Sequence, residues 1–226
     1  MGVTRDDDDS ARTLLVIGAG GHAKVVIELA RAAGWTPVAA FDPAPPADMV
    51  LGVPVKGDDA AAEDWIRSGR LSRVVAAIGQ NALRRRLGMR LRAIGARMPV
   101  LVHPSAVVSP SATLGAGTVV MAGAVINASA RIGCDVIVNT LGVVEHDCVL
   151  GDGCHVAPRS ALGGGCSIGA GALLGLGACA RPRSMIGDDA VVGAGAVVIG
   201  AVPNDATATG VPAEIVPSRV EAPDDA

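Results

Sequence analysis

Aromatic side chains are almost missing from this chain of 226 residues, which has one Phe, two Trp and no Tyr. Most globular cores rely on aromatic rings for bulk, so branched aliphatic and small residues must fill the interior here. No apolar run reaches the roughly 18 residues that a membrane-spanning helix needs. Basic tracts are missing as well, and the net charge is −3. We therefore expect neither a membrane nor a nucleic acid as a partner.

The first residues, MGVTRDDDDS, lack the cationic start and apolar stretch of a secretory signal. The acidic run Asp6–Asp9 is typical of a solvated segment, and residues 1–11 are expected to form a disordered tail. The five cysteines are an odd number without paired spacing, which fits a reducing compartment better than a disulfide framework. These features predict a cytoplasmic protein.

The most informative pattern is a repeat of six residues. An aliphatic side chain recurs at sixteen successive sixth positions without an insertion, and only Ala180 among them is not Val, Ile or Leu. A small residue generally stands four residues after each of them. The sixteen positions are Val108, Leu114, Val120, Ile126, Ile132, Val138, Val144, Leu150, Val156, Leu162, Ile168, Leu174, Ala180, Ile186, Val192 and Val198.

A period of six fits neither an α-helix nor a simple strand, and it is typical of a parallel β-helix built from hexapeptides. Each hexapeptide supplies one short strand and a turn, three of them close a triangular coil, and the coils stack about 4.8 Å apart. Stacked aliphatic side chains leave no room for rings, which explains the missing aromatics. Cys148, Cys154 and Cys166 occupy the small position, where a thiol acts as an apolar filler. We expect the β-helix to span residues 101–203.

Residues 12–100 follow a different pattern, in which apolar strands alternate with helical segments. This order predicts a small, open, parallel sheet that corresponds to one mononucleotide-binding half of a doubly wound fold. The chain is thus expected to join an α/β, Rossmann-like domain to an all-β solenoid. Strands are expected at 14–17, 37–41, 52–55 and 73–79, and helices at 23–33, 59–68 and 84–96.

A glycine-rich turn, GAGGHA, joins the first expected strand to the first helix. Gly18, Gly20 and Ala23 match G-x-G-x-x-A, a turn that lets the backbone approach a phosphate at a helix N-terminus. Asp42 ends the second strand, where an acid commonly meets a ribose or a base. Because a second mononucleotide half is missing and His22 lies inside the loop, a single nucleotide diphosphate is favoured over NAD. A glycine turn that only packs is the plainer alternative.

Taken together, the two halves resemble the nucleotide-sugar acetyltransferases of the sialic-acid O-acetyltransferase superfamily. The nearest resemblance is to bacterial N-acetyltransferases acting on nucleotide-linked 4-amino sugars of the bacillosamine and perosamine kind. It extends from about Leu14 to Val216 and implies a left-handed β-helix, an acetyl-CoA co-substrate and a homotrimer. The matching stretches are VIGAGGHAKVV, LGVPVKGDD, AAIGQNALRRRL, HPSAVVSPSATLGAGTVVMAGAVIN, NTLGVVEHDC and TGVPA.

The resemblance also implies roles for single residues. His146 matches the catalytic histidine, Asp147 the carboxylate that orients it, and Asn139 a polar residue of the same site. The residues implied near acetyl-CoA are His155, Gly164, Leu176, Gly210, Pro212 and Ala213. The residues implied at the nucleotide sugar are Gly20, Gly21, His22, Asp42 and Gly79. Two departures matter: Pro43 follows Asp42 where some relatives have a second acid, and Glu214 stands where a basic residue is common.

The chemistry of VVEHDC supports a catalytic reading independently. A sugar amine must be neutral to attack a thioester, and an imidazole with an ordinary pKa of about 6.5 can accept its proton. A carboxylate on the other ring nitrogen would fix the tautomer, and by sequence alone either Glu145 or Asp147 could supply it; resemblance favours Asp147. A backbone N–H such as that of Gly164 could stabilise the oxyanion. No metal and no covalent enzyme intermediate is required.

Other functions stay open at this point. Transfer to a hydroxyl, as in sialic-acid-type O-acetyltransferases, needs the same general base. A β-helical zinc lyase would need three histidine ligands, whereas only His146 and His155 lie in the solenoid. A non-enzymatic scaffold that binds nucleotide is the third class. The nucleotide base (UDP, GDP, dTDP or CDP), the sugar and the acceptor carbon are not readable from the sequence.

Overall fold

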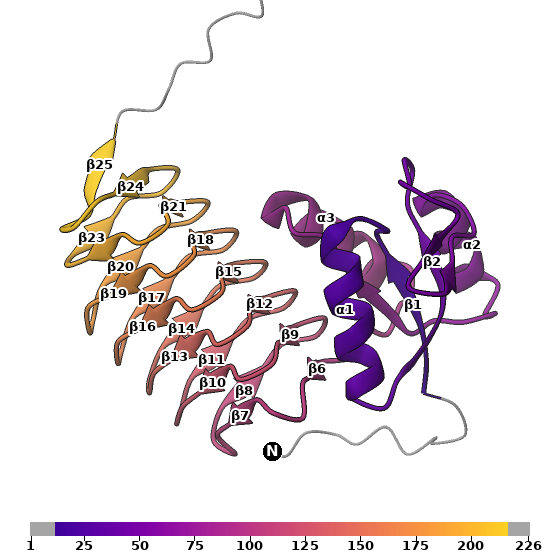
Figure 1. Cartoon of the computed structure of the whole chain (residues 1–226), viewed down its shortest axis with the longest axis horizontal. Helices are drawn as coiled ribbons and strands as arrows, with labels where there is room; N and C mark the ends of the chain where they lie inside the picture. Colours follow the sequence, from indigo (N-terminus) through magenta and orange to yellow (C-terminus); the bar gives the residue numbers. More distant parts are fainter. Residues whose placement is uncertain (1–11, 217–226) are drawn as a thin grey trace, which may run out of the picture.

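The computed structural model describes residues 12–216, so the expectations for residues 1–11, including Asp6–Asp9, and for 217–226 lie outside the described residues. Figure 1 shows two parts side by side, an N-terminal α/β domain and a solenoid of stacked coils. None of the helices within residues 12–216 has the length and apolar content that a bilayer crossing requires.

The N-terminal domain is built on a parallel sheet of three strands in the order β2-β1-β5. The strands are β1 (Thr13–Ile17), β2 (Thr36–Phe41) and β5 (Val74–Ala76), and the helices are α1 (Gly21–Ala32), α2 (Asp59–Arg67) and α3 (Asn81–Ala93). Alternate residues of the strands point to opposite faces. Leu14 and Val16 pack with α1, whereas Leu15 and Ile17 pack with residues of α2 and α3. The sheet is therefore covered on both faces.

The strand expected at 52–55 is not a full member of this sheet. It forms a short antiparallel hairpin from β3 (Met49–Val50) and β4 (Val53–Pro54), and a single bridge joins Val55 to Ala40 of β2. Leu51 and Gly52 between the strands both have positive φ, 46° and 78°, which is the backbone of the tight hairpin turns that match strand twist. The turn geometry thus pairs this segment with its own neighbour.

The six-residue repeat forms a left-handed parallel β-helix, as expected. Each of the sixteen aliphatic residues is the second residue of a two-residue strand, β7 to β22, and pairs with the residue eighteen positions away, as Val108 does with Ile126. Their side chains and the small residues before each strand form one continuous core. The strands before and after the repeat are β6 (Leu101–Val102), β23 (Ala201–Val202), β24 (Thr207–Thr209) and β25 (Glu214–Val216).

The strands stack into three faces, each named here after one of its strands. The β10 face contains β7, β10, β13, β16, β19 and β22; the β11 face contains β8, β11, β14, β17, β20 and β23; the β12 face contains β6, β9, β12, β15, β18, β21 and β24. The β12 face is the one turned towards the N-terminal domain (Figure 1). The spacing shortens at the C-terminal end, where Ile186 pairs with Val202, and β24 pairs antiparallel with β25.

Helix α3 lies along the edge between the β11 and β12 faces. Turn residues eighteen positions apart meet it one after another. Asp135 is fully buried and forms an ion pair of 2.7 Å with Arg92, while Gly88 leaves the space that the Asp135 carboxylate occupies. Asn81 donates to the carbonyl of Gly171 over 2.9 Å. The two domains are therefore joined by polar contacts as well as by apolar packing.

Candidate functional site

A column of outward-facing residues on the β12 face leads to the site. Leu101, Val119 and Ile137, each eighteen residues apart, are buried against residues of α1. His155 is the next residue in this column, followed by Leu173. A titratable ring therefore replaces an aliphatic side chain at the point where the N-terminal domain stops covering the solenoid.

A groove opens at this point between the two domains. Its cavity measures about 440 Å³. The N-terminal domain supplies the loop after β5 and the start of α3, and the solenoid supplies outward residues of three successive coils. The lining residues are Gly79, Gln80, Asn81, Ala82, His155, Gly171, Leu173, Asp189 and Val191. The predicted substrate residue Gly79 and the predicted coenzyme residue His155 thus line one cavity.

His155 is held as a neutral ring. Burial, and then the positive charge of Arg84 and the neighbouring His22, lower its pKa to about 3. The backbone N–H of Thr140 donates to Asn139 Oδ1 over 2.8 Å, so the Asn139 amide presents its Nδ2 to His155 Nε2 over 3.0 Å. Nε2 therefore accepts, and the proton of His155 lies on Nδ1. The predicted site residue Asn139 fixes the tautomer of His155 and does not contact His146.

His22, in the N-terminal domain, lies close enough to His155 to help lower the pKa of that ring. It is the second residue of α1, directly after Gly20 and Gly21, whose α-hydrogens face open space. Burial and the Arg84 charge lower the pKa of His22 to about 4. Its Nε2 is buried without a hydrogen-bond partner among residues 12–216. A buried polar atom without a partner is costly, so this atom and the first turn of α1 are well placed to receive a polar ligand.

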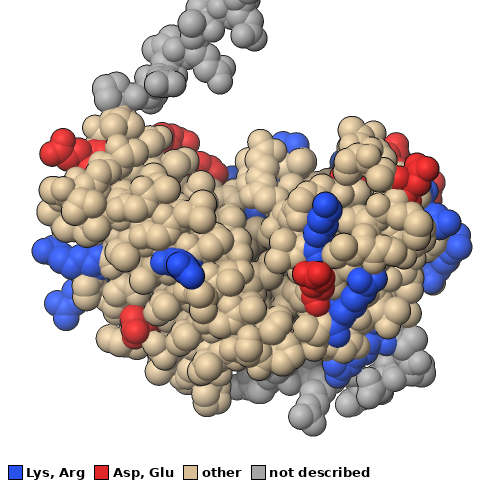
Figure 2. All heavy atoms as spheres, viewed as in Figure 1, with Lys and Arg blue, Asp and Glu red and all other residues tan. Residues whose placement is uncertain are grey.

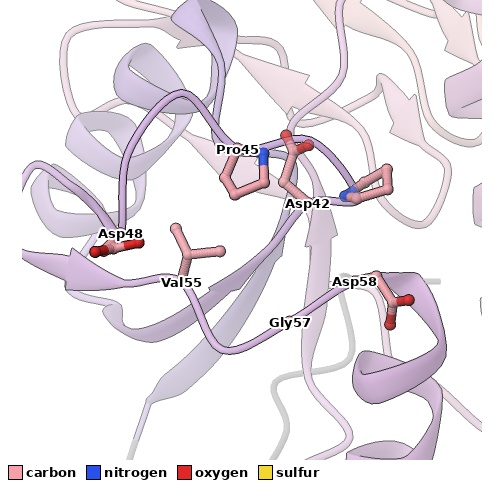
Figure 3. A pocket seen from close by; sticks show the side chains of 7 residues that line it. Asp42, Pro45, Asp48, Val55, Gly57 and Asp58 are labelled. Carbon is pink, nitrogen blue, oxygen red and sulfur yellow. The ribbon is translucent and has the colours of Figure 1, made fainter.

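Asp42 lies beside a second cavity, of about 460 Å³, at the end of β2. Its Oδ2 accepts from the N–H of Ala19 over 2.8 Å and its Oδ1 from the N–H of Ala44 over 2.9 Å. The carboxylate therefore ties the glycine-rich turn to the strand. Figure 3 shows Asp42 across the cavity from Asp48. The residues around the cavity are Asp42, Pro43, Pro45, Asp48, Val55, Gly57 and Asp58.

His146 lies elsewhere, in a turn on the edge between the β10 and β11 faces. Its Nδ1 is 2.8 Å from Asp147 Oδ2, and the side chains are 63% and 66% exposed. Asp147 has a φ of 60°, the left-handed value that this turn position adopts throughout the solenoid. Of the two flanking acids, Asp147 is thus the one bonded to the ring, which leaves Nε2 as the nitrogen free to accept a proton.

Gly164 stands one coil above His146 on the same edge. A Cβ at this position would lie 2.5 Å from His146 Nε2, so the imidazole occupies the place of the missing side chain. The backbone N–H of Gly164 makes no hydrogen bond within residues 12–216. A proton acceptor and a free N–H donor therefore lie side by side on an exposed edge.

The remaining predicted coenzyme residues follow the third edge, between the β12 and β10 faces. Leu176 is 62% exposed there. The loop with Gly210, Pro212 and Ala213 folds back over the end of the β10 face, where the N–H of Ala213 donates to the carbonyl of Val197 over 2.8 Å. One chain thus holds the predicted residues in four places: the groove with the adjoining start of α1, the Asp42 cavity, the His146 edge and this third edge.

The sequence reading missed Arg84, which it placed only at the start of a helix. The side chain is 1% exposed and bonds to both domains. A signal existed, because Arg84 falls on the same helical face as Leu87 and Leu91, both buried. An arginine on an apolar stripe indicates a buried partner. No group of three His, Cys, Asp or Glu side chains that could hold a metal occurs in residues 12–216.

Comparison with known proteins shows the family of the chain. Residues 13–91 match the family described as the PglD N-terminal domain. The chain is 51% identical to PerB from Caulobacter crescentus, solved with CoA and GDP-perosamine, over 91% of this chain and 97% of that one, with a TM-score of 0.86. It is 40% identical to the acetyltransferase domain of PglB from Neisseria gonorrhoeae, solved with acetyl coenzyme A, over 91% and 100%, with a TM-score of 0.85.

Two further Caulobacter crescentus structures are variants of the perosamine N-acetyltransferase in which one histidine is replaced by Asn or Ala. Both have a TM-score of 0.87 with this chain. WeeI from Acinetobacter baumannii, at 24% identity over 90% of this chain and 99% of that one, shares the fold, with a TM-score of 0.67.

The lowered pKa of His155 predicts how stability depends on pH. The unfolded ring binds a proton near pH 6.5, whereas the folded ring stays neutral down to about pH 3. Acidification between these values therefore favours the unfolded chain, by up to about 1.4 kcal/mol per pH unit. Urea unfolding from pH 8 to pH 4 should show that His155→Asn loses less stability below pH 6.5 than the parent. Parallel curves for the two proteins would contradict the burial of a neutral ring.

Proposed function

The chain belongs to the family of perosamine- and bacillosamine-type N-acetyltransferases, and from this premise we propose that it acetylates the amino group of a nucleotide-linked 4-amino-4,6-dideoxy sugar. It is an acyltransferase, and acetyl-CoA is the proposed donor. The observation that carries the proposal is the likeness to PerB over almost the whole of both chains. His146, Asp147 and Gly164 supply the chemistry that such a transfer requires.

The nucleotide sugar is assigned to the N-terminal side of the groove. The free N–H groups at the start of α1, with Gly20, Gly21 and His22, suit the diphosphate. The cavity beside Asp42 suits the base. We propose GDP as the nucleotide, because PerB was solved with GDP-perosamine. The Asp48 carboxylate at this cavity is an acceptor, and guanine presents the N2 amino group as a donor.

The proposed reaction is direct attack of the sugar amine on the thioester carbonyl. His146 Nε2 takes the proton of the attacking amine, while Asp147 on Nδ1 stabilises the imidazolium that forms. The N–H of Gly164 donates to the tetrahedral oxyanion, and a donor of this kind is typically worth about 2.7 to 4 kcal/mol. When the intermediate collapses, the C–S bond breaks and CoA leaves as the thiol. Leu176, Gly210, Pro212 and Ala213 are assigned to the coenzyme.

Within one chain, the proposed general base His146 lies far from the groove, which supports assembly with other copies. His146 lies on the edge opposite the β12 face, to which the groove belongs. We propose a homotrimer in which the His146 edge of one copy completes the groove of its neighbour. The β10 face presents an uncharged outward column suited to such contact, consisting of Val107, Val125, Val143, Ala161, Cys179 and Val197.

The reaction is tested by thiol release from acetyl-CoA. A GDP-linked 4-amino-4,6-dideoxy sugar should turn over, whereas its 4-hydroxyl counterpart should not, because the hydroxyl is the weaker nucleophile. The UDP-linked amino sugar serves as the control for the identity of the nucleotide base. His146→Asn should lose at least about a hundredfold in kcat, the lower range for a general base. Turnover of the hydroxyl sugar alone would move the assignment to O-acetylation, and near-normal His146→Asn activity would remove His146 from the mechanism.

The contact between Gly164 and His146 gives a second prediction. Gly164→Ala places a methyl group where the imidazole lies, so kcat should fall by roughly ten- to a hundredfold as the ring is displaced. Gly200→Ala is the control, since Gly200 lies on the same edge, in the shorter turn between β22 and β23, and a Cβ there meets nothing within 4 Å. Equal activity of the two variants in the thiol-release assay would show that the ring does not act from this position.

A further inference from the structure

Arg84 is a buried cation that bonds to both walls of the groove. On the N-terminal side, Nη1 donates to the carbonyls of Ile78 over 2.9 Å and Gly79 over 3.1 Å. On the solenoid side, Nε donates to the carbonyl of Asp135 over 2.8 Å and Nη2 to that of Gly153 over 2.7 Å. The guanidinium thus connects the loop after β5 with two successive coils.

The network continues through Asn81 at the start of α3. Arg84 Nη2 donates to Asn81 Oδ1 over 2.9 Å, which orients the amide. Asn81 Nδ2 then donates to the carbonyls of Gly171 and Ala172, in the next coil, over 2.9 and 3.0 Å. Gly79, Asn81 and Gly171 all line the groove. The width of the groove is therefore set by hydrogen bonds that start from one side chain.

Among residues 12–216, no carboxylate is bonded to Arg84. The nearest acid, Asp135, gives its carboxylate to Arg92 in two bonds of 3.0 and 2.7 Å and offers Arg84 only its carbonyl. Burial lowers the pKa of Arg84 to about 10, which leaves the guanidinium charged at neutral pH. The direct partners of this charge are peptide carbonyls and the Asn81 amide oxygen, and its field reaches the rings of His22 and His155.

We infer that Arg84 is a positioning residue for acetyl transfer, which holds the two walls of the groove at a fixed separation. The inference rests on the proposed function, because it assigns the acceptor to this groove. Arg84 does not touch the reacting atoms. It acts through Gly79 and Asn81 on one wall and through the turn at Gly153 on the other.

Neutral rings matter for what the groove can bind. A neutral His155 keeps Nε2 as the acceptor of the Asn139 amide and leaves Nδ1 as a hydrogen-bond donor. The charged and titratable groups around it are Arg84 from α3, His22 from α1 and, at the far end of the cavity, Asp189. After burial, Arg84 is the larger of the charge effects that lower the pKa of His155. Removing its charge should let both rings take up protons more readily.

The first test compares two conservative variants in the same helix. Arg84→Lys keeps a positive charge, but a single ammonium group cannot hydrogen-bond to both walls of the groove as the guanidinium does. We expect kcat/KM for the nucleotide sugar to fall roughly a hundredfold, as for a displacement near 1 Å. Arg92→Lys keeps an ion pair with Asp135 across the same interface and should stay close to the parent. Acetyl-CoA binding and melting temperature should change alike in the two variants. An equal loss of kcat/KM in both, or none in Arg84→Lys, would overturn the inference.

The second test reads the charge directly. The chain has four histidines, so their ring signals can be assigned and titrated by NMR. In Arg84→Met the pKa values of His22 and His155 should rise, whereas in Arg84→Lys they should stay near those of the parent. Unchanged values in Arg84→Met would remove the electrostatic role. If Arg84→Met does not fold, the Lys variant decides. If the parent protein turns over no nucleotide sugar, the proposed function is refuted. The histidine titration would still test whether the Arg84 charge acts on His22 and His155.

Discussion

Before its shortened C-terminal end, each coil of the solenoid takes eighteen residues, and the part of the site that the solenoid supplies follows from this spacing. Residues eighteen positions apart lie directly above one another, so each column of the sequence has one physical task. One column provides the apolar surface for α1 and then, at His155, the polar floor of the groove. Another places Gly164 over His146. A third presents Asp135, Gly153 and Gly171 in turn to helix α3.

Apolar burial in the regular solenoid core offsets the cost of burying charged groups at the domain junction. Each buried Val, Leu or Ile side chain contributes about 1.5–3 kcal/mol, and such residues make up more than half of the solenoid core, with Ala and Cys as the rest. This gain offsets the burial of Arg84 and Asp135 and the partial burial of Arg92 at the domain junction, where removing one partner of a buried pair typically costs 3–5 kcal/mol. Charged side chains elsewhere are scattered over the surface without a broad patch of one sign on the face shown in Figure 2. The charge buried at the junction thus fixes the separation of the two walls of the groove.

The solenoid was predictable from the sequence because the six-residue period consists of aliphatic side chains that must point inward. The glycine turn was predictable because closely spaced glycines between a strand and a helix indicate a tight turn. The sequence left the choice between Glu145 and Asp147 open, since alternation along a strand cannot decide it; the left-handed turn at Asp147 does. The hairpin at 49–54 follows from the local turn at Leu51 and Gly52, which the sequence analysis did not use. The hydrogen-bond partners of Arg84 depend on tertiary contacts, which local patterns do not contain. That Asn139 belongs with His155, and lies apart from His146, follows only from the assignment of each residue to a face or an edge of the coil.

The central claim is that the catalytic site forms between copies, with His146 of one chain serving the groove of another. Co-expression of His146→Asn with His22→Ala tests it most directly, because each variant alone lacks one half of the site. If the halves come from different chains, random assembly leaves about a quarter of the interfaces with both halves intact, and thiol release should recover to about that share of the parent activity. Activity no higher than that of either variant alone would place both halves in one chain and contradict the account.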